Sequence, residues 1–462
     1  MQGKNSPLVL GSESISKLIV KYSVPAIIAM TATSLYNIVD SIFIGHGVGS
    51  MAIAGLAITF PLMNLLMAFC ALIAVGGATI SSIFLGQKDE QRAAEVLNNV
   101  FTMCLVNGII FGTVTYIFLK PILMFFGATE GTVGYASEFM EIILMATPIS
   151  YVFLGLNFLI RATGYPMKAM ISVLLTVLAN IVLAPVFIFV FGWGMRGAAL
   201  ATVLSQTLSL IWVVSHFLNK NSFIRFRKGE KWLDLKILSR IVGIGLSPFI
   251  MNVCACVVVI FINKALLAHG ESAGDLAVGT YGIINRTAML FVMIVFGITQ
   301  GMQPILGYNF GANQWDRVKK TLRIGIIAGV SITTLGWIIG EFMPGAISRM
   351  FTDDAVLIDM SNNGFRLSFI AWPFIGAQIV IQNFFQSIGK PKISIFLSFT
   401  RQLIFLVPLL IIFPRIWGVD GVWISLSASD FIASLLAVVI LVIEIKKLNK
   451  RFQNLSPISN QS

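Results

Sequence analysis

An aspartate inside a long apolar run is the residue of this sequence best placed to do chemistry. Asp40 lies in the segment from about Leu18 to Ile44, which is long enough to cross a bilayer as a helix. A carboxylate near the middle of such a helix costs at least ~2.5 kcal/mol. These groups usually face a bundle interior or a watery cavity, where they bind ions or relay protons. We therefore expect the chain to be organised around Asp40; a satisfied structural hydrogen bond between helices is the alternative.

The composition shows what kind of protein holds this aspartate. Of 462 residues, 57% are hydrophobic and only 11% are charged, against about 25% charged residues in soluble domains. We predict an all-α polytopic membrane protein with twelve transmembrane helices. The expected spans are 18–44, 53–84, 97–120, 135–160, 168–191, 197–218, 239–267, 277–308, 322–343, 364–388, 393–413 and 419–445.

The basic residues predict how the chain lies in its membrane. Of the 32 lysines and arginines, 24 fall in the termini and loops of one side and five on the other. The positive-inside rule places both termini in the cytoplasm, in the cytoplasmic membrane of a prokaryote. This placement explains the net charge of +12, and we expect no nucleic acid among the partners.

The chain repeats itself. Gly86 matches Gly311, Pro148 matches Pro373 and Pro25 matches Pro248, with separations of 223 to 225 residues. Each half has an even number of spans, so the repeats are parallel and related by an axis along the membrane normal. We expect an N-terminal six-helix lobe (1–218), a cytoplasmic linker (219–236), a C-terminal lobe (237–448) and a polar tail (449–462). Two such bundles predict a central cleft suited to alternating access.

Where the halves differ, the first lobe offers ligands for a cation. Asp40 matches Asn263, so only the first lobe carries an acid there. Asn180 and Thr202, on the fifth and sixth spans, add an amide oxygen and a hydroxyl at similar depth. Pro185 cannot donate to a carbonyl in its own helix, and a freed carbonyl can bind a cation. Asn180 and Thr202 as interhelical hydrogen-bonding residues are the plain alternative.

The second lobe carries its own acid. Asp430, near one end of the last span, matches Gln206 of the first lobe. The arginines within spans, Arg286 and Arg401 among them, either pair with carboxylates or extend to an interface. The four cysteines and three histidines form no metal-binding pattern, so sodium at Asp40 is the one metal ion we consider. The candidates for substrate contact or coupling are Asp430, Tyr36, Asn37, Gln206, Asn157 and Arg286.

Several motifs resemble one transporter family. They are Pro25 with Tyr36-Asn-Ile-Val-Asp40 and Ile44-Gly45, Ala52 to Pro61, Gly76-Gly-Ala-Thr79, Arg161 to Pro166, Tyr281 to Arg286 and Gly301 to Ala312. Together they resemble the multidrug and toxic compound extrusion (MATE) family, in its MepA-like branch, over roughly Ile15 to Lys447.

The resemblance implies a fold, an activity and a coupling ion. The fold is a V-shaped pair of six-helix bundles, and the activity is export of apolar, often cationic drugs by sodium or proton antiport. The cation site of the family maps onto Asp40, Asn180 and Thr202. Ala184 replaces an acid that the family often has beside Pro185, which favours a proton or a weaker sodium site. The acids that the NorM-type branch uses in the second lobe are absent from the seventh span.

These observations predict a drug exporter and leave two rivals. We expect no enzyme activity and no cofactor besides H⁺ or Na⁺, with small-molecule substrates, the lipid bilayer as surroundings and a monomeric state. A flippase for lipid-linked precursors, from the same superfamily, would need a strongly cationic cleft. A membrane enzyme or receptor would need a nucleophile–base pair, a metal motif or a soluble output domain, and the sequence shows none of these.

Overall fold

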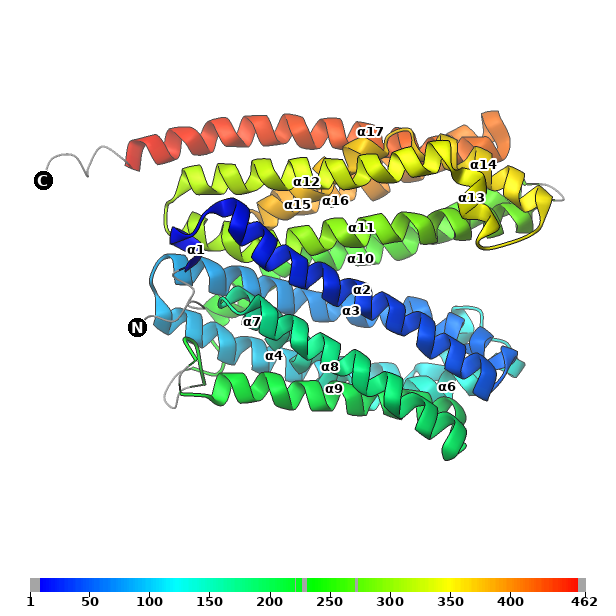
Figure 1. The fold of residues 1–462 in the computed structure, drawn as a ribbon, viewed down its shortest axis with the longest axis horizontal. Coiled ribbons are helices and arrows are strands. Elements are labelled where there is room, and N and C mark those ends of the chain that lie inside the picture. The colour runs from blue at the N-terminus through cyan, green and yellow to red at the C-terminus, as the bar shows by residue number, and fades with distance from the viewer. Residues whose placement is uncertain (1–8, 221, 227–230, 271–272, 456–462) are drawn as a thin grey trace, which may run out of the picture. The chain divides into compact units, whose positions relative to one another are not determined.

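The computed structural model describes residues 9–220, 222–226, 231–270 and 273–455. Within these residues every regular element is a helix, so the all-α prediction is confirmed for the described part of the chain (Figure 1). The elements are α1 (Val9–Ser12), α2 (Ile15–Gly47), α3 (Ser50–Gly86), α4 (Glu90–Ile117), α5 (Leu119–Phe125), α6 (Glu130–Met145), α7 (Thr147–Ala162), α8 (Pro166–Pro185), the π-helix η1 (Val186–Val190), α9 (Gly194–Leu218), α10 (Leu235–His269), α11 (Gly274–Gly311), α12 (Trp315–Phe342), α13 (Pro344–Arg349), α14 (Ala355–Phe369), α15 (Trp372–Ser387), α16 (Pro391–Phe399), the π-helix η3 (Thr400–Leu406) and α17 (Val407–Leu455).

The apolar helices match the predicted number of spans. Nine helical runs in the described residues are long and apolar enough to cross a membrane, and two bent pairs bring the number to eleven. The last run, Pro391–Gln453, is interrupted at Trp417 and Gly418, whose backbone angles are not helical. Counted as two segments, it gives the twelve spans of the sequence prediction.

Prolines explain both bent pairs. The helices α6 and α7 meet at 58°, and α14 and α15 meet at 52°. In each case a proline, Pro148 or Pro373, is the second residue of the new helix. Proline lacks the N–H that would continue the preceding helix but fits the first turn of the next one. The two prolines are partners in the repeat, so the repeat sets the same bend twice.

The structure divides by contacts into two units, which we describe separately. In its described residues, unit 1 comprises Val9–Glu13 and Val24–Asn252. Its helices α3, α4 and α7 pack on one another, and α8 packs along α9. The first turns of α10 also belong to unit 1, where a side chain at Gly245 would overlap the Leu72 carbonyl. Only glycine permits this close approach of α10 to α3.

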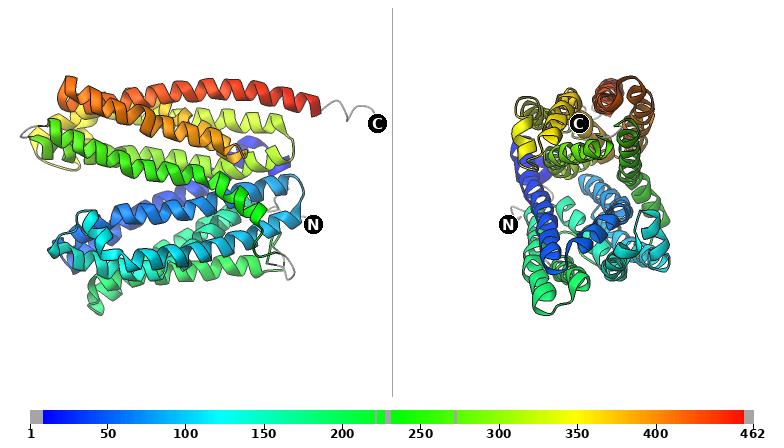
Figure 2. Two further views of the ribbon diagram at one scale, coloured as in Figure 1. Left: turned by 180° about the vertical axis from the view of Figure 1, so that it is seen from behind. Right: turned by 90° about the vertical axis from the view of Figure 1, so that its right-hand side faces the viewer.

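Unit 2 comprises Ser14–Ser23 and, in its described residues, Val253–Leu455. Its helices α11, α12 and α15 pack together, and α17 packs on α14 and α15. The end-on view in Figure 2 shows its helices bundled side by side. The first turns of α2 belong to this unit: Ser23 Oγ donates to the Ile298 carbonyl at 3.3 Å. A Cβ at Gly301 would lie 2.6 Å from the Ser23 Cα, so this contact too depends on glycine.

The division therefore falls inside α2 and α10, whereas the predicted lobes divide at the linker 219–236. Residues 221, 227–230 and 456–462 of the predicted linker and tail lie outside the described residues. At the end of the linker, the Asp234 N–H donates to Asn99 Oδ1 at 2.8 Å, which ties α10 to α4. Backbone N–H groups of Lys236 and Ile237 bond the Asp234 carboxylate and lower its pKa.

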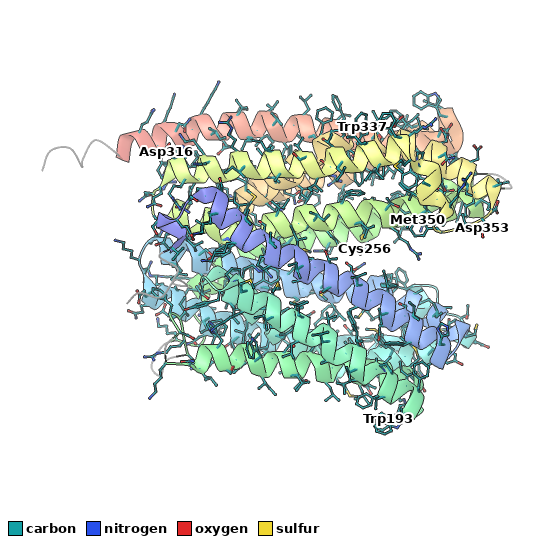
Figure 3. All side chains as sticks on the ribbon, viewed as in Figure 1. Trp193, Cys256, Asp316, Trp337, Met350 and Asp353 are labelled. Atoms are coloured by element: carbon teal, nitrogen blue, oxygen red, sulfur yellow. The ribbon has the colours of Figure 1, made fainter. Side chains whose placement is uncertain are left out.

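Polar groups gather at the helix ends. Figure 3 shows Asp316 at the start of α12 and Asp353 beyond the opposite end of that helix, after α13. The large apolar side chains between such ends are widely exposed in the structure, as is typical of helices that face lipid.

Candidate functional site

Asp40 lies on α2 and is buried, with 6% of its surface exposed. Its Oδ1 atom has no hydrogen-bond partner among the described residues. The residue stands seven positions before Gly47, where α2 ends, which is about 10 Å along the helix. The expectation that Asp40 lies near the middle of its span is wrong, since the residue is close to the end of the predicted span 18–44 as well as of α2. A buried carboxylate oxygen without a partner is costly, so this position is suited to gaining a proton or a cation.

Beside Asp40, three predicted residues form one hydrogen-bonded network. Tyr36 stands one helical turn before Asp40 on α2, and its hydroxyl lies 3.1 Å from Thr202 Oγ1. Asn180 Nδ2 donates to the same oxygen at 3.2 Å. Thr202 donates its own proton to the Ala198 carbonyl at 3.2 Å. The structure therefore brings α2, α8 and α9 together at the Thr202 hydroxyl.

The network lies at one depth because of how α8 and α9 are joined. Asn180 precedes Pro185 by five residues, and Thr202 follows the start of α9 at Gly194 by eight. Beyond Pro185 the backbone continues as the π-helical turn η1, since proline cannot supply the next helical hydrogen bond. At about 1.5 Å per residue, Asn180 lies about 7.5 Å from Pro185 and Thr202 about 12 Å from Gly194, depths similar to that of Asp40.

The oxygen atoms of this network limit which cation can bind beside Asp40. The Thr202 hydroxyl donates once and receives the Asn180 amide and the Tyr36 hydroxyl, so its lone pairs are used. In the described part of the chain, no three His, Cys, Asp or Glu side chains gather to hold a metal ion. A hard cation needs several oxygen ligands, whereas a proton needs only the spare oxygen of Asp40.

Other predicted residues of unit 1 lie outside this network. Gln206 accepts a hydrogen bond from Ser150, which joins α9 to α7. Asn157 is 2% exposed and donates to the Ala169 carbonyl and to Ser172, which pins α7 to α8. Asn37 is exposed on α2. Gln206 and Asn157 therefore join neighbouring helices.

The acid of unit 2 has a different environment. Asp430 Oδ1 accepts from Arg401 Nε at 2.8 Å, so of the two alternatives left open for Arg401, pairing is the one observed. Arg401 also donates to Gln378 Oε1 at 3.3 Å. Arg286 is exposed on α11 and makes no ion pair within the described residues. In the sequence, Asp430 stands out because the matching position of the first half holds Gln206, which is not an acid.

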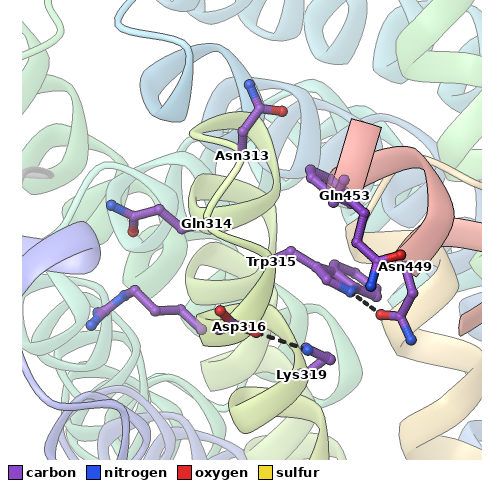
Figure 4. A pocket seen from close by; sticks show the side chains of 9 residues that line it. Asn313, Gln314, Trp315, Asp316, Lys319, Asn449 and Gln453 are labelled. Atoms are coloured by element: carbon purple, nitrogen blue, oxygen red, sulfur yellow. Dashed lines mark hydrogen bonds and ion pairs between the residues drawn. The ribbon is translucent and has the colours of Figure 1, made fainter. Parts of the chain in front are cut away.

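A separate pocket lies at the ends of helices in unit 2 (Figure 4). It measures about 790 Å³ and is lined by Trp315, Asp316, Asn449 and Phe452, among others. Trp315 Nε1 donates to Asn449 Oδ1 at 2.5 Å, and the Trp315 and Phe452 rings stack 5.1 Å apart. Asp316 pairs with Lys319 at 2.8 Å. These groups are engaged in holding α17 against the start of α12, and none belongs to the predicted site.

Comparisons with known proteins give the context of this geometry. The sequence profile of the MatE family matches residues 25–186 and 244–412. The chain is 27% identical over 427 residues to the multidrug export protein MepA of Staphylococcus haemolyticus, covering 92% of this chain and 93% of the relative. MepA of Staphylococcus aureus (strain NCTC 8325) is 27% identical over 431 residues, with the same coverage.

Solved structures share the fold. A MATE crystal structure in the bent conformation superposes with a TM-score of 0.91 at 22% identity, over 98% of this chain and 100% of that one. The MATE multidrug transporter DinF-BH is 34% identical with a TM-score of 0.86, over 96% and 98% of the two chains. The predicted fold class is therefore confirmed.

Proposed function

Because this chain belongs to the MatE family of membrane transporters, we propose that it exports apolar, often cationic compounds by antiport against an inward-moving cation. The relatives support this substrate class, since MepA is named a multidrug export protein and DinF-BH a multidrug transporter. The observation that carries the proposal is the buried Asp40 carboxylate with an unpartnered oxygen beside the Tyr36–Thr202–Asn180 network.

The proposed mechanism uses the charge of Asp40. When the site opens to the exterior, Asp40 takes up a cation and becomes neutral. Loss of its charge weakens the attraction for a cationic substrate and lets α2 repack against α8 and α9. The ion can drive export only if it binds the substrate-releasing arrangement better than the other. The position of Asp40, about 10 Å from one end of α2, supports loading from a single side.

We propose a proton as the coupling ion. Support comes from the Thr202 hydroxyl, whose lone pairs are occupied, and from Ala184, which leaves α8 without a second acid. Sodium would have to displace the Asn180 and Tyr36 hydrogen bonds to reach Thr202. The excess of basic residues on one side supports an orientation with both termini in the cytoplasm. A monomeric state stays a prediction.

Proteoliposomes with imposed gradients test this proposal. Efflux of rhodamine 123 is followed with a proton gradient alone, a sodium gradient alone, or neither. We expect a proton gradient, acidic on the side that receives the dye, to accelerate transport about tenfold, and a sodium gradient to do much less. Transport driven only by sodium would overturn proton coupling, and transport unaffected by either gradient would overturn antiport. For the flippase alternative, binding of a lipid-linked pyrophosphate is measured in detergent; the acids Asp40 and Asp430 within the spans argue against the strongly cationic cleft that a flippase would need.

A further inference from the structure

The arginine of unit 2 is held in an unusual piece of backbone. Arg401 lies in the π-helical turn η3 (Thr400–Leu406), and such turns are frequent at functional sites. Its carbonyl accepts from Ser429 Oγ at 2.8 Å, and its side chain bonds Asp430 and Gln378. Gln378 is in turn next to Gln382, which donates to Ser398 at 2.7 Å. The guanidinium is therefore held from α15 and α17.

The ion pair lies deep in the membrane-spanning part of unit 2. Arg401 follows Pro391, where α16 begins, by ten residues, and Asp430 follows the break at Gly418 by twelve. At about 1.5 Å per residue these are depths of about 15 and 18 Å from opposite ends. Both values fall near the middle of a hydrocarbon core of about 30 Å. Asp430 therefore lies near the middle of its span, and the expectation that it lies near one end is wrong.

The guanidinium keeps donors to spare. Arginine has five N–H groups, and in the described part of the chain the Arg401 side chain uses one on Asp430 and one on Gln378. The Asp430 side chain is 14% exposed, but that of Arg401 is 27% exposed. A charged group at this depth faces a bundle interior or a water-filled space, because exposure to lipid is costly. Part of the Arg401 side chain therefore stays accessible, with N–H groups that make no hydrogen bond to the described residues.

We propose that the free edge of Arg401 binds a carboxylate group of transported compounds, with Asp430 and Gln378 as positioning residues. A planar guanidinium can hold two acceptors on different edges, and its fork matches a carboxylate. The Asp430 charge keeps Arg401 in place and also weakens the hold on a second carboxylate, so such compounds can be released. This inference rests on the proposed export function and adds a substrate class, zwitterions, to it.

Two dyes that share one fluorophore test the inference. Rhodamine 110 carries a free carboxylate, and rhodamine 123 carries the methyl ester of the same group. Binding of each dye is measured by fluorescence anisotropy on the detergent-solubilised full chain, and efflux is measured in proteoliposomes. We expect Arg401→Lys to weaken rhodamine 110 binding about tenfold, which corresponds to about 1.4 kcal/mol, because lysine keeps the charge but loses the fork. Rhodamine 123 binding should change less than about twofold.

A second variant should change rhodamine 110 binding in the opposite direction. Asp430→Asn removes the competing negative charge, so we expect it to tighten rhodamine 110 binding at least about twofold while rhodamine 123 binding is unchanged. If the pair had only a structural role, both variants would weaken the binding of both dyes equally. The matched control is Arg366→Lys, which changes an exposed arginine of α14 and should alter neither dye.

The outcomes separate this inference from the function on which it rests. If the wild-type protein transports rhodamine 123 but does not bind rhodamine 110, or if Arg401→Lys weakens both dyes alike, the carboxylate site is wrong and export stands. If rhodamine 123 itself is not transported, export fails, whereas selective rhodamine 110 binding in detergent still supports the site. Thermal unfolding of each variant shows that it is folded.

Discussion

Two acids of the membrane-spanning helices, Asp40 of unit 1 and Asp430 of unit 2, have opposite environments, because only Asp430 has a cationic partner. Asp40 of unit 1 has a spare oxygen and hydroxyl and amide neighbours, whereas Asp430 of unit 2 forms an ion pair with Arg401. The repeat places an amide opposite each of them, Asn263 opposite Asp40 and Gln206 opposite Asp430. An acid without a counter-charge can gain a proton at little cost. Neutralising the paired acid would leave the partly exposed Arg401 without its counter-charge, which costs more than protonating an unpaired acid.

The largest effect should follow from removing the unpaired acid. Asp40→Asn keeps the shape of the side chain but cannot change its charge. We expect gradient-driven dye efflux to fall at least about tenfold, to the passive level, while thermal stability is kept because no ion pair is lost. The control is Glu138→Gln, which removes an exposed acid that lies 3.6 Å from Arg196. Normal energised efflux in Asp40→Asn would end the proposed coupling role.

An intermediate effect, on stability, should follow from breaking the paired acid. Arg401→Leu leaves the Asp430 carboxylate uncompensated, and we expect a loss of about 2–3 kcal/mol, somewhat below the range for fully buried pairs because this pair is partly exposed. The double variant Arg401→Leu with Asp430→Leu removes both charges and should recover most of that loss. Chemical denaturation in detergent measures both. Equal losses of stability in the single and double variants would show that Arg401 does not compensate the Asp430 charge.

The smallest effect should follow from Thr202→Val, which sharpens the description of unit 1. Valine keeps the shape but leaves the Asn180 amide and the Tyr36 hydroxyl without their shared acceptor. We expect a cost of about 1 kcal/mol and a severalfold shift in the proton concentration that half-saturates efflux. Thr207→Val on the same helix removes only a bond to the Val203 carbonyl and should leave that concentration unchanged. An equal shift in both variants would contradict a specific network.

Much of the architecture could be predicted from local pattern. The helices follow from long apolar runs, and the bends at Pro148 and Pro373 follow from a residue that cannot continue a helix. Asp40, Asn180 and Thr202 could be grouped because repeat position and span depth restrict where polar residues meet. The roles expected of Asn37 and Asn157 in substrate contact or coupling stay predictions, since span depth does not say which way a side chain points on its helix.

The sequence by itself determined the membrane-spanning helices, the internal repeat and the two acids, Asp40 and Asp430, that match an amide in the other half. Only the tertiary structure decided which acid is paired, because Arg401 and Asp430 are 29 residues apart and their contact depends on how η3 packs against α17. It also decided that the first turns of α2 and α10 belong to the other half of the chain. That exchange rests on backbone contacts at Gly301 and Gly245, and a glycine in a sequence does not say which helix will lie against it.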